Sequence, residues 1–250
     1  KNFLVGLGLN ETYGNTLVSE KTAGVFGNSI KLLNAQSSEL SFLRTSLIPG
    51  ALELVARNIN VSEKDLSIFE IGSVFNKIND NMTSFEDFSE EQNMLILLTG
   101  QAIKKQWLSQ DRKFDVFDLK GYTSALLKNI FLDNFTSYIY NADGISLFNL
   151  NFALVIDSLV VGHAGRIERE LLKQFGIEQD VYCAEISVTK LKKKLQEINE
   201  APKFKELLRF PKIQKDFAFV FDSSVQYEDI YKFIRENCSE LLKEVSLFDI

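Results

Sequence analysis

The amino-acid sequence predicts an α+β fold in which antiparallel strands and helices are segregated along the chain. Segments with apolar residues at three- and four-residue spacings are typical of helices, whereas shorter continuous apolar runs have the length of strands. Two such runs, 152–156 and 159–162, flank Asp157-Ser158, a turn pair that favours a hairpin and therefore antiparallel pairing. With 250 residues, 45% of them hydrophobic, the chain is long enough to bury a large core.

The first 36 residues predict short elements. Residues 1–9 have the pattern of a helix end, with Phe3, Leu4 and Leu7 as its apolar residues. A short strand is expected over 12–18, a turn over 24–28 and another strand over 29–33.

The stretch 37–75 organises the rest of the chain. Arg44 lies within the apolar run 43–47, and Pro49 is well placed to open a helix with Ile48, Leu52, Val55, Ala56 and Ile59 on one side. A strand is expected over 66–75, with Glu70 interrupting its apolar residues and Gly72 at a bulge or a close backbone approach. Because a buried charge needs a partner, we expect Arg44 and Glu70 to form a partly buried ion pair with a structural role.

The middle of the chain predicts alternating elements. We expect an acidic mobile loop over 76–92, a strand over 94–98, and a helix capped by Asp118 that extends to about Phe131. After the hairpin come a helix over 166–175 closed by Gly176, a strand over 181–188, and a basic helix capped by Thr189.

Ala201-Pro202 predicts a domain boundary, which divides the chain into 1–200 and 201–250. Beyond it we expect a strand over 213–222, a helix over 227–237 with Ile230, Tyr231 and Ile234 inward, and a strand over 245–250. Two strands and one helix bury too little surface to close a domain. The segment is therefore expected to be the first half of a ferredoxin-like module, in a piece of a longer polypeptide.

Composition limits the possible functions. A net charge of −6 argues against a general nucleic-acid surface, but nine basic and three acidic residues lie between Lys190 and Lys215. That segment is either a solvated face or an RNA-facing patch. Cys183, Cys238 and His163 are too few for a zinc site and favour a reducing, cytoplasmic compartment. No apolar run is long enough to span a membrane, and no signal peptide opens the chain.

Five phrases in register resemble the C-terminal part of the β chain of bacterial phenylalanyl-tRNA synthetase. They are LRTSLIPG at 43–50, ARNIN at 56–60, LSIFEIGSVF at 66–75, FDLKG at 117–121 and RFP at 209–211 followed by Lys215-Asp216. The resemblance implies an antiparallel-sheet, class II synthetase-like domain over 1–200. It also implies that the module at 201–250 is part of a ferredoxin-like anticodon-binding domain.

Enzymes with that fold hold ATP through an arginine at the end of one strand and a glycine-rich strand that ends in a second arginine. Here Asn76-Lys77 follow the first strand, and Lys cannot offer the bidentate fork of Arg. The strand 181–188 has no Gly and leads into Thr189-Lys190. The sequence therefore predicts a catalytically inactive domain without a catalytic residue, metal or cofactor of its own. The resemblance implies ATP and Mg²⁺ for the whole ligase. His163 is expected to be structural, because no nucleophile accompanies it.

The resemblance implies two partners. One is the catalytic α chain, contacted through Phe3, Leu4 and Leu7, although these residues are equally consistent with a core helix of the same domain. The other is tRNA(Phe), for which Arg209, Lys212, Lys215 and Phe210 are the candidate contacts. Phe217, Phe219 and Phe221 alternate onto one face, a pattern that favours core. The alternative functions are a free-standing interaction module with the same fold and an active synthetase with a displaced arginine.

Overall fold

The structure is a computed structural model. It describes residues 1–26, 28–79, 84–130, 136–140, 147–197, 211, 213–222, 224–225, 227–238 and 241–247. The chain divides into two compact units, Lys1–Asn199 and Glu200–Ile250. Each unit is described by itself below.

The first unit is built around a seven-stranded sheet in the order β1-β5-β6-β12-β11-β10-β9. Every neighbouring pair is antiparallel except β1 with β5. The strands are β1 (Asn10–Glu11), β5 (Leu66–Lys77), β6 (Phe88–Thr99), β9 (Thr136–Tyr140), β10 (Phe148–Ile156), β11 (Leu159–Ile167) and β12 (Val181–Ser187). The antiparallel sheet that the sequence predicts is confirmed.

Smaller elements surround this sheet. The strands β2 (Leu17–Val18), β4 (Phe42–Leu43) and β3 (Ile30–Lys31) form a three-stranded sheet in that order, beside α2 (Glu20–Ala23) and the 3-10 turn η1 (Ser38–Leu40). The strands β7 (Gln101–Ile103) and β8 (Arg112–Lys113) form a separate two-stranded hairpin. A second 3-10 turn, η2 (Phe85–Asp87), precedes β6.

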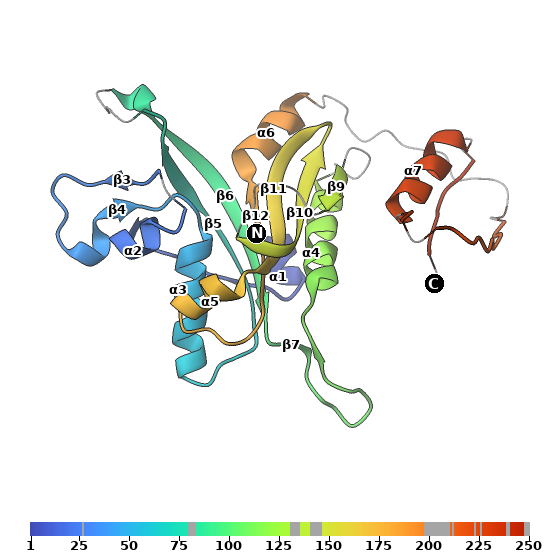
Figure 1. The fold of residues 1–250 in the computed structure, drawn as a ribbon, viewed down its shortest axis with the longest axis horizontal. Helices are drawn as coiled ribbons and strands as arrows, with labels where there is room; N and C mark the ends of the chain where they lie inside the picture. Colours follow the sequence, from blue (N-terminus) through green and yellow to red (C-terminus); the bar gives the residue numbers. More distant parts are fainter. Residues whose placement is uncertain are drawn as a thin grey trace. The chain divides into compact units, whose positions relative to one another are not determined.

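Helices cover both faces of the large sheet and divide the core into two clusters (Figure 1). On one face lie α1 (Asn2–Gly6), α4 (Val116–Asn129) and α6 (Val188–Glu197). On the other lie α3 (Ile48–Asn60) and α5 (Arg169–Gln174). Because side chains alternate along a strand, Phe69 and Ile71 of β5 face the first cluster, and Ile68 and Val74 face the second.

The organising stretch folds largely as predicted. Helix α3 begins at Ile48 with proline at its start, and Ile48, Leu52 and Val55 are buried. The strand over 66–75 forms and continues to Lys77. Its ladder with β6 runs without a register shift, so Gly72 is not at a bulge. Gly72 instead marks a close approach, because a Cβ there would lie 2.1 Å from Nη2 of Arg44.

The acidic loop predicted over 76–92 is wrong in its described part. Residues 76–77 belong to β5, residues 84–87 form a capped turn, and β6 already begins at Phe88. The charged residues there, Glu90 and Glu91, pair across the ladder with Phe75 and Val74. Hydrogen bonding between two long strands therefore outweighs the polar composition that suggested a loop.

Three helix starts also differ from the prediction. Asp115 caps α4, while Asp118 is the third helical residue and bonds back to the amide of Asp115 in a capping box. For α6 the hydroxyl of Ser187 accepts the amide of Lys190, so the cap precedes Thr189. Helix α5 starts at Arg169 and not at Arg166, because Arg166 still belongs to β11, where it pairs with Tyr182 of β12.

The predictions of the 157–158 hairpin turn, of Gly176 as a helix end and of the helix over 227–237 are confirmed. Asp157 and Ser158 have φ of 46° and 68°, the positive pair that a two-residue type I′ hairpin requires. Gly176 closes α5 with φ of 72°. In the second unit α7 spans Tyr227–Asn237, with Ile230, Tyr231 and Ile234 among its less exposed residues.

The strands predicted in the second unit are not observed in its described residues. Residues 213–222 and 245–247 have no strand pairing. A strand is held by hydrogen bonds to a neighbour, and none of the described residues of this unit supplies one. Within the part of the chain that the structure describes, no helix combines the length and apolarity needed to cross a bilayer.

Candidate functional site

A network of polar side chains lies inside the first unit on the α3 side of the sheet, and we call it the polar centre. It consists of Arg44, Ser46, Glu70, Asn93 and Glu185. Its two acids lie on β5 and β12, the strands on either side of β6, and both pair in register with Leu95. The resemblance to class II synthetases implies that these two strands would carry a nucleotide site, so the polar centre is where that chemistry has to be sought.

Arg44 and Glu70 form a buried ion pair. Nη1 of Arg44 donates to Oε1 of Glu70 at 2.6 Å, and Nε donates to the carbonyl oxygen of Ser73 at 2.9 Å. Only 7% of Arg44 and 3% of Glu70 is exposed. The backbone of Arg44 is also held, since its amide donates to Thr16 and its carbonyl accepts the amide of Phe75. The structure thus brings together the two residues that the sequence pairs.

Two glycines enclose this ion pair. A Cβ on Gly72 would meet Nη2 of Arg44 at 2.1 Å, and one on Gly14 would lie 3.0 Å from Oε2 of Glu70 and 3.1 Å from Nη1 of Arg44. The guanidinium is therefore covered by backbone and faces a carboxylate. With 7% of Arg44 exposed, it has no open space in which a phosphate group could reach it.

Glu185 occupies the centre of β12, and three donors surround its carboxylate. Oγ of Ser46 donates at 2.5 Å, the amide of Leu47 at 3.1 Å and Nδ2 of Asn93 at 2.9 Å. Ser46 also accepts the amide of Ile48, the first residue of α3. The carboxylate therefore satisfies the start of α3, where unpaired amides and the helix dipole favour a negative charge.

Burial raises the pKa of Glu185, and the hydrogen bonds from Ser46, Asn93 and Leu47, together with the charge of Arg44, oppose that rise. On the same strand, burial raises the pKa of the Cys183 thiol well above its ordinary value, and nearby Glu185 adds to the rise. A thiol in that state is a poor nucleophile. On the α3 side β12 therefore carries an acid and an inert thiol, whereas an ATP-binding strand is expected to carry a cation.

The two residues that follow the first strand, in place of the expected arginine, put no cation on the α3 face of the sheet. Asn76 follows Val74 by two positions, so its side chain starts on the α3 face, whereas Lys77 starts on the opposite face with Phe69 and Ile71. Both still lie in the β5–β6 ladder, opposite Ser89 and Phe88. At the end of β12 the chain passes directly into α6 at Val188.

His163 lies on β11 in register with Glu185. Burial lowers the pKa of this histidine, and the nearby charge of Lys190 lowers it further. Its Nδ1 is buried and has no hydrogen-bond partner in the described part of the chain. Among the described residues no group of three or more His, Cys, Asp or Glu could hold a metal ion.

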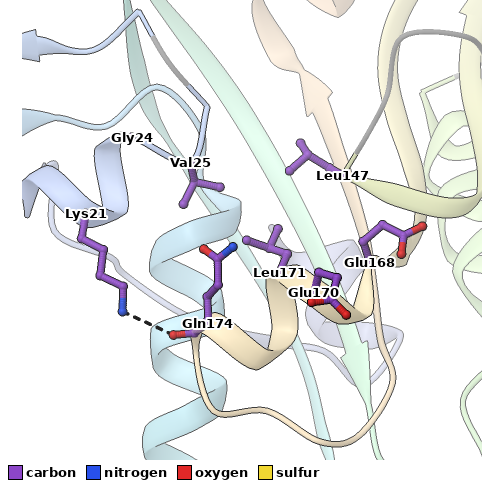
Figure 2. A pocket seen from close by; sticks show the side chains of 8 residues that line it. All are labelled: Lys21, Gly24, Val25, Leu147, Glu168, Glu170, Leu171 and Gln174. Carbon is purple, nitrogen blue, oxygen red and sulfur yellow. Dashed lines mark hydrogen bonds between the residues drawn. The ribbon is translucent and has the colours of Figure 1, made fainter.

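A pocket of about 630 Å³ lies away from the polar centre, between α2 and α5 (Figure 2). Its charged lining residues are Lys21, Glu168 and Glu170, and Nζ of Lys21 donates to the carbonyl oxygen of Gln174 at 3.4 Å. Two carboxylates against one engaged lysine would repel a phosphate ligand. This pocket therefore does not replace the missing nucleotide site.

The predicted interface residues lie on α1. Leu4 is 1% exposed within the core, and Phe3 and Leu7 are partly buried against it. This placement favours the core interpretation for Leu4. Val5, on the same helix, is 55% exposed. An interface at this helix stays a prediction.

The predicted RNA contacts all fall within the sequence range of the second unit. Arg209, Phe210 and Lys212 are outside the described residues, and Lys215 is exposed. Phe217, Phe219 and Phe221 do share a face, with ring centroids 6.1 Å and 5.7 Å apart along the row. They are not core in the described residues, since 66%, 64% and 50% of these side chains are exposed.

Sequence reasoning missed Ser46, Asn93 and Glu185. One signal was present, because Glu185 interrupts the apolar run of β12 as Glu70 interrupts that of β5. A charge in such a run requires partners. Ser46 and Asn93 have no comparable signature, since only the sheet register brings β6 and the start of α3 to Glu185.

Comparisons with known proteins agree with this geometry. The model of the phenylalanyl tRNA synthetase beta chain CLM domain matches residues 1–188, and that of the ferredoxin-fold anticodon binding domain matches residues 209–250. The phenylalanine–tRNA ligase beta subunits of Bacteroides fragilis and Chlorobium luteolum are 30% and 29% identical over 99% and 98% of this chain. The chain spans 31% of the length of each.

Two solved structures of pyrrolysyl-tRNA synthetase from Desulfitobacterium hafniense share the fold. Their TM-scores are 0.56 and 0.57 at 13% identity, covering 78% of this chain and 66% of theirs. The α+β, class II synthetase-like fold is therefore confirmed. From the family-model match over residues 1–188, the chain belongs to the phenylalanyl-tRNA synthetase beta chain family.

Proposed function

We propose that this chain is a non-catalytic part of the β subunit of phenylalanine–tRNA ligase. In this role it supports assembly with the catalytic α subunit and the binding of tRNA(Phe) during aminoacylation. The names of the relatives support the ligase over a free-standing interaction module. A cytoplasmic location follows from the same role and from the unpaired cysteines.

The observation that carries the proposal is the state of Arg44. It is the arginine of the polar centre, and its donors face Glu70 and Ser73 under the cover of Gly72. A cation stabilises an α-phosphate only if its donors can reach the phosphate oxygens. The residues present therefore do not fit ATP, and ATP with Mg²⁺ belongs to the α subunit of the ligase in this proposal.

Two regions would carry the partner contacts. On α1 the exposed Val5 offers an apolar contact to the α subunit, and Phe3 and the helix-capping Leu7 are only partly buried against the core. In the second unit Lys215 and the exposed row Phe217, Phe219 and Phe221 offer a cation and stacking surfaces to an unpaired stretch of tRNA. Arg209, Phe210 and Lys212 precede this row in the sequence and are the further candidate contacts.

The proposal is tested by reconstitution. The β subunit that contains this chain should co-purify with the matching α subunit, and the pair should aminoacylate tRNA(Phe). The 250-residue chain alone should catalyse no phenylalanine-dependent ATP–pyrophosphate exchange. Exchange by the chain alone would show an active synthetase with a displaced arginine, and failure to co-purify would favour the free-standing module.

A further inference from the structure

A basic hairpin projects from the first unit and carries the chain's only tryptophan. We define it as residues 101–113, with β7 and β8 as its strands (Figure 1). At its tip Trp107 is 94% exposed and its neighbour Leu108 is 79% exposed. An indole ring has a large apolar surface and usually packs against other atoms of the protein. The first unit therefore gains almost no burial from the tip of this hairpin.

The base of the hairpin, in contrast, is firmly held. Gly100 adopts φ of 80°, and a Cβ on it would collide with the backbone of Lys64 and with Asp65 at about 2.5 Å. Oδ1 of Asp65 accepts the amide of Gln101 at 2.9 Å, and the amide of Phe114 donates to Gly100 at 3.0 Å. The chain thus leaves the large sheet and returns beside its point of departure before α4 begins.

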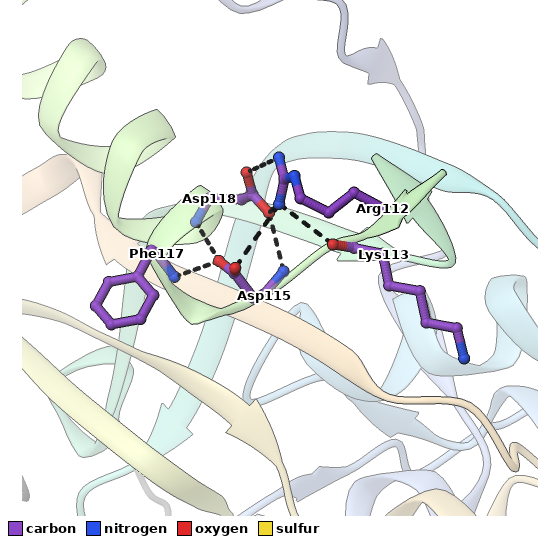
Figure 3. A network of polar contacts seen from close by, with 5 residues as sticks. All are labelled: Arg112, Lys113, Asp115, Phe117 and Asp118. Carbon is purple, nitrogen blue, oxygen red and sulfur yellow. Dashed lines mark hydrogen bonds and ion pairs between the residues drawn. The ribbon is translucent and has the colours of Figure 1, made fainter. Parts of the chain in front are cut away.

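A second attachment joins β8 to α4 (Figure 3). The guanidinium of Arg112 donates to both carboxylate oxygens of Asp118, at 2.6 Å and 2.8 Å, and lies 3.7 Å from Asp115. The bond to Arg112 lowers the pKa of Asp118. A bidentate pair of this kind fixes orientation as well as position. The base of the hairpin is therefore held in a fixed orientation, while its tip packs against no other part of the first unit that the structure describes.

The hairpin as a whole has a net positive charge. Lys104, Lys105, Arg112 and Lys113 accompany one acid, Asp111, in a chain whose net charge is −6. Arg112 is engaged by Asp118, and Lys104 lies 3.5 Å from Asp65 while remaining largely exposed. Figure 3 shows the Lys113 side chain pointing away from the Arg112 network. Lys105 precedes Trp107 by two residues, near the tip, whereas Lys113 pairs with Gln101 at the base of the hairpin. These cations therefore lie at the two ends of the projection.

We propose that the basic hairpin binds single-stranded RNA, with Trp107 at its tip stacking on an unpaired base. Lys105 near the tip and Lys113 at the base would contact phosphates at different points along the strand. This inference deepens the proposed role in tRNA binding and rests on it, but it assigns the contact to the first unit. Aromatic stacking combined with nearby cations is the usual chemistry of single-strand recognition, and it needs only one ring and a few lysines.

The alternative partner for the hairpin tip is another protein, whose pocket would receive Trp107. A stable protein interface covers about 800 Å² on each partner, usually around a broad apolar patch. The hairpin offers two adjacent apolar side chains on a narrow projection, and the residues around them are charged. Its charge is complementary to a phosphate backbone.

Because Trp107 is the chain's only tryptophan, its intrinsic fluorescence reports on this one position. The 250-residue chain is titrated with a single-stranded oligouridylate of about ten nucleotides and with an RNA duplex of equal length. We expect saturable quenching by the single strand that weakens as salt increases, and little quenching by the duplex. Absence of quenching by the single strand, or equal quenching by both, overturns the proposal.

Variants locate the contact by anisotropy of the labelled single strand. Trp107→Ala should weaken binding about tenfold or more, since stacking on one base contributes that order of affinity. The matched control is Phe85→Ala, because Phe85 is 88% exposed but lies among acidic residues, and it should change nothing. Lys105→Gln and Lys113→Gln should each lower the salt slope by about 0.7, and Lys173→Gln should not. Equal losses in the controls contradict the proposal.

The outcome is separable from that of the proposed function. Co-purification with the α subunit does not depend on Trp107, so a failed titration with successful co-purification rejects the hairpin contact alone. A shift of Trp107 emission to shorter wavelength on adding the α subunit, without quenching by RNA, would assign the tip to a protein pocket and reject RNA.

Discussion

The polar centre and the basic hairpin handle their charged residues in opposite ways. In the polar centre Arg44 pairs with Glu70, and Glu185 accepts hydrogen bonds from nearby donors. Two glycines lie against the ion pair. In the hairpin the polar contacts hold only the base, and Trp107 and Leu108 are left uncovered. The first arrangement stabilises the fold and buries its charged groups away from a ligand. The second contributes little to the fold and presents its side chains to a partner.

The largest effect on stability is expected at the buried ion pair of the polar centre. Arg44→Met leaves the carboxylate of Glu70 buried without its cation, so the free energy of unfolding should fall by about 3–5 kcal/mol. In the double variant Arg44→Met/Glu70→Met both charges are replaced by apolar groups, and most of that loss should be recovered. Urea unfolding monitored by circular dichroism measures both values.

An exposed pair serves as the control. Nζ of Lys173 lies 2.8 Å from Oε1 of Glu170, a distance close to that of the buried pair, but both side chains are mostly exposed. Lys173→Met should cost less than about 1 kcal/mol, as solvent-exposed pairs usually do. If Lys173→Met and Arg44→Met destabilise the chain equally, burial is not what makes Arg44 structural.

A smaller effect is expected at the glycine that covers the guanidinium. Gly72→Ala would place its Cβ 2.1 Å from Nη2 of Arg44, so the arginine must move away from Glu70. Overpacking of this kind costs about 1–3 kcal/mol. Gly121→Ala in α4 is the matched control, because no atom lies within 4 Å of its added Cβ, and it should stabilise the helix by about 0.5–1 kcal/mol. Thermal unfolding of both variants tests the sign of each change.

The same contrast explains what could be predicted from the sequence. Arg44 and Glu70 interrupt apolar runs, and a buried charge requires a partner, so their pairing could be inferred without coordinates. Glu185 carries the same signal, but its donors come from residues 46, 47 and 93, which only the strand register brings together. Residues 84–92 were misassigned because local composition favoured a loop, whereas pairing with β5 is a long-range effect. The exposed position of Trp107 could not be predicted, because an aromatic residue is ordinarily expected in a core.

The smallest effect concerns the carboxylate at the start of α3, and it appears as a pH dependence. Burial raises the pKa of Glu185 from 4.5, so above that pH the folded chain binds more protons than the unfolded chain. Its contribution to stability is therefore full below about pH 4.5 and is lost as the pH rises through the folded pKa. Glu185→Gln keeps the shape of the side chain and removes this titration. The free energy of unfolding of the wild-type chain relative to the variant should therefore fall with increasing pH.

Asp118 provides an internal control of opposite sign. Arg112 lowers the pKa of Asp118 from 3.8, so the wild-type chain relative to Asp118→Asn should lose stability as the pH falls through the folded pKa. Urea unfolding at intervals between about pH 3 and 8 follows both differences. A difference for Glu185→Gln that is flat or rises with pH would show that the three donors outweigh burial. In that case the polar centre would hold a fully charged carboxylate, and its exclusion of phosphate would be stronger than the raised pKa implies.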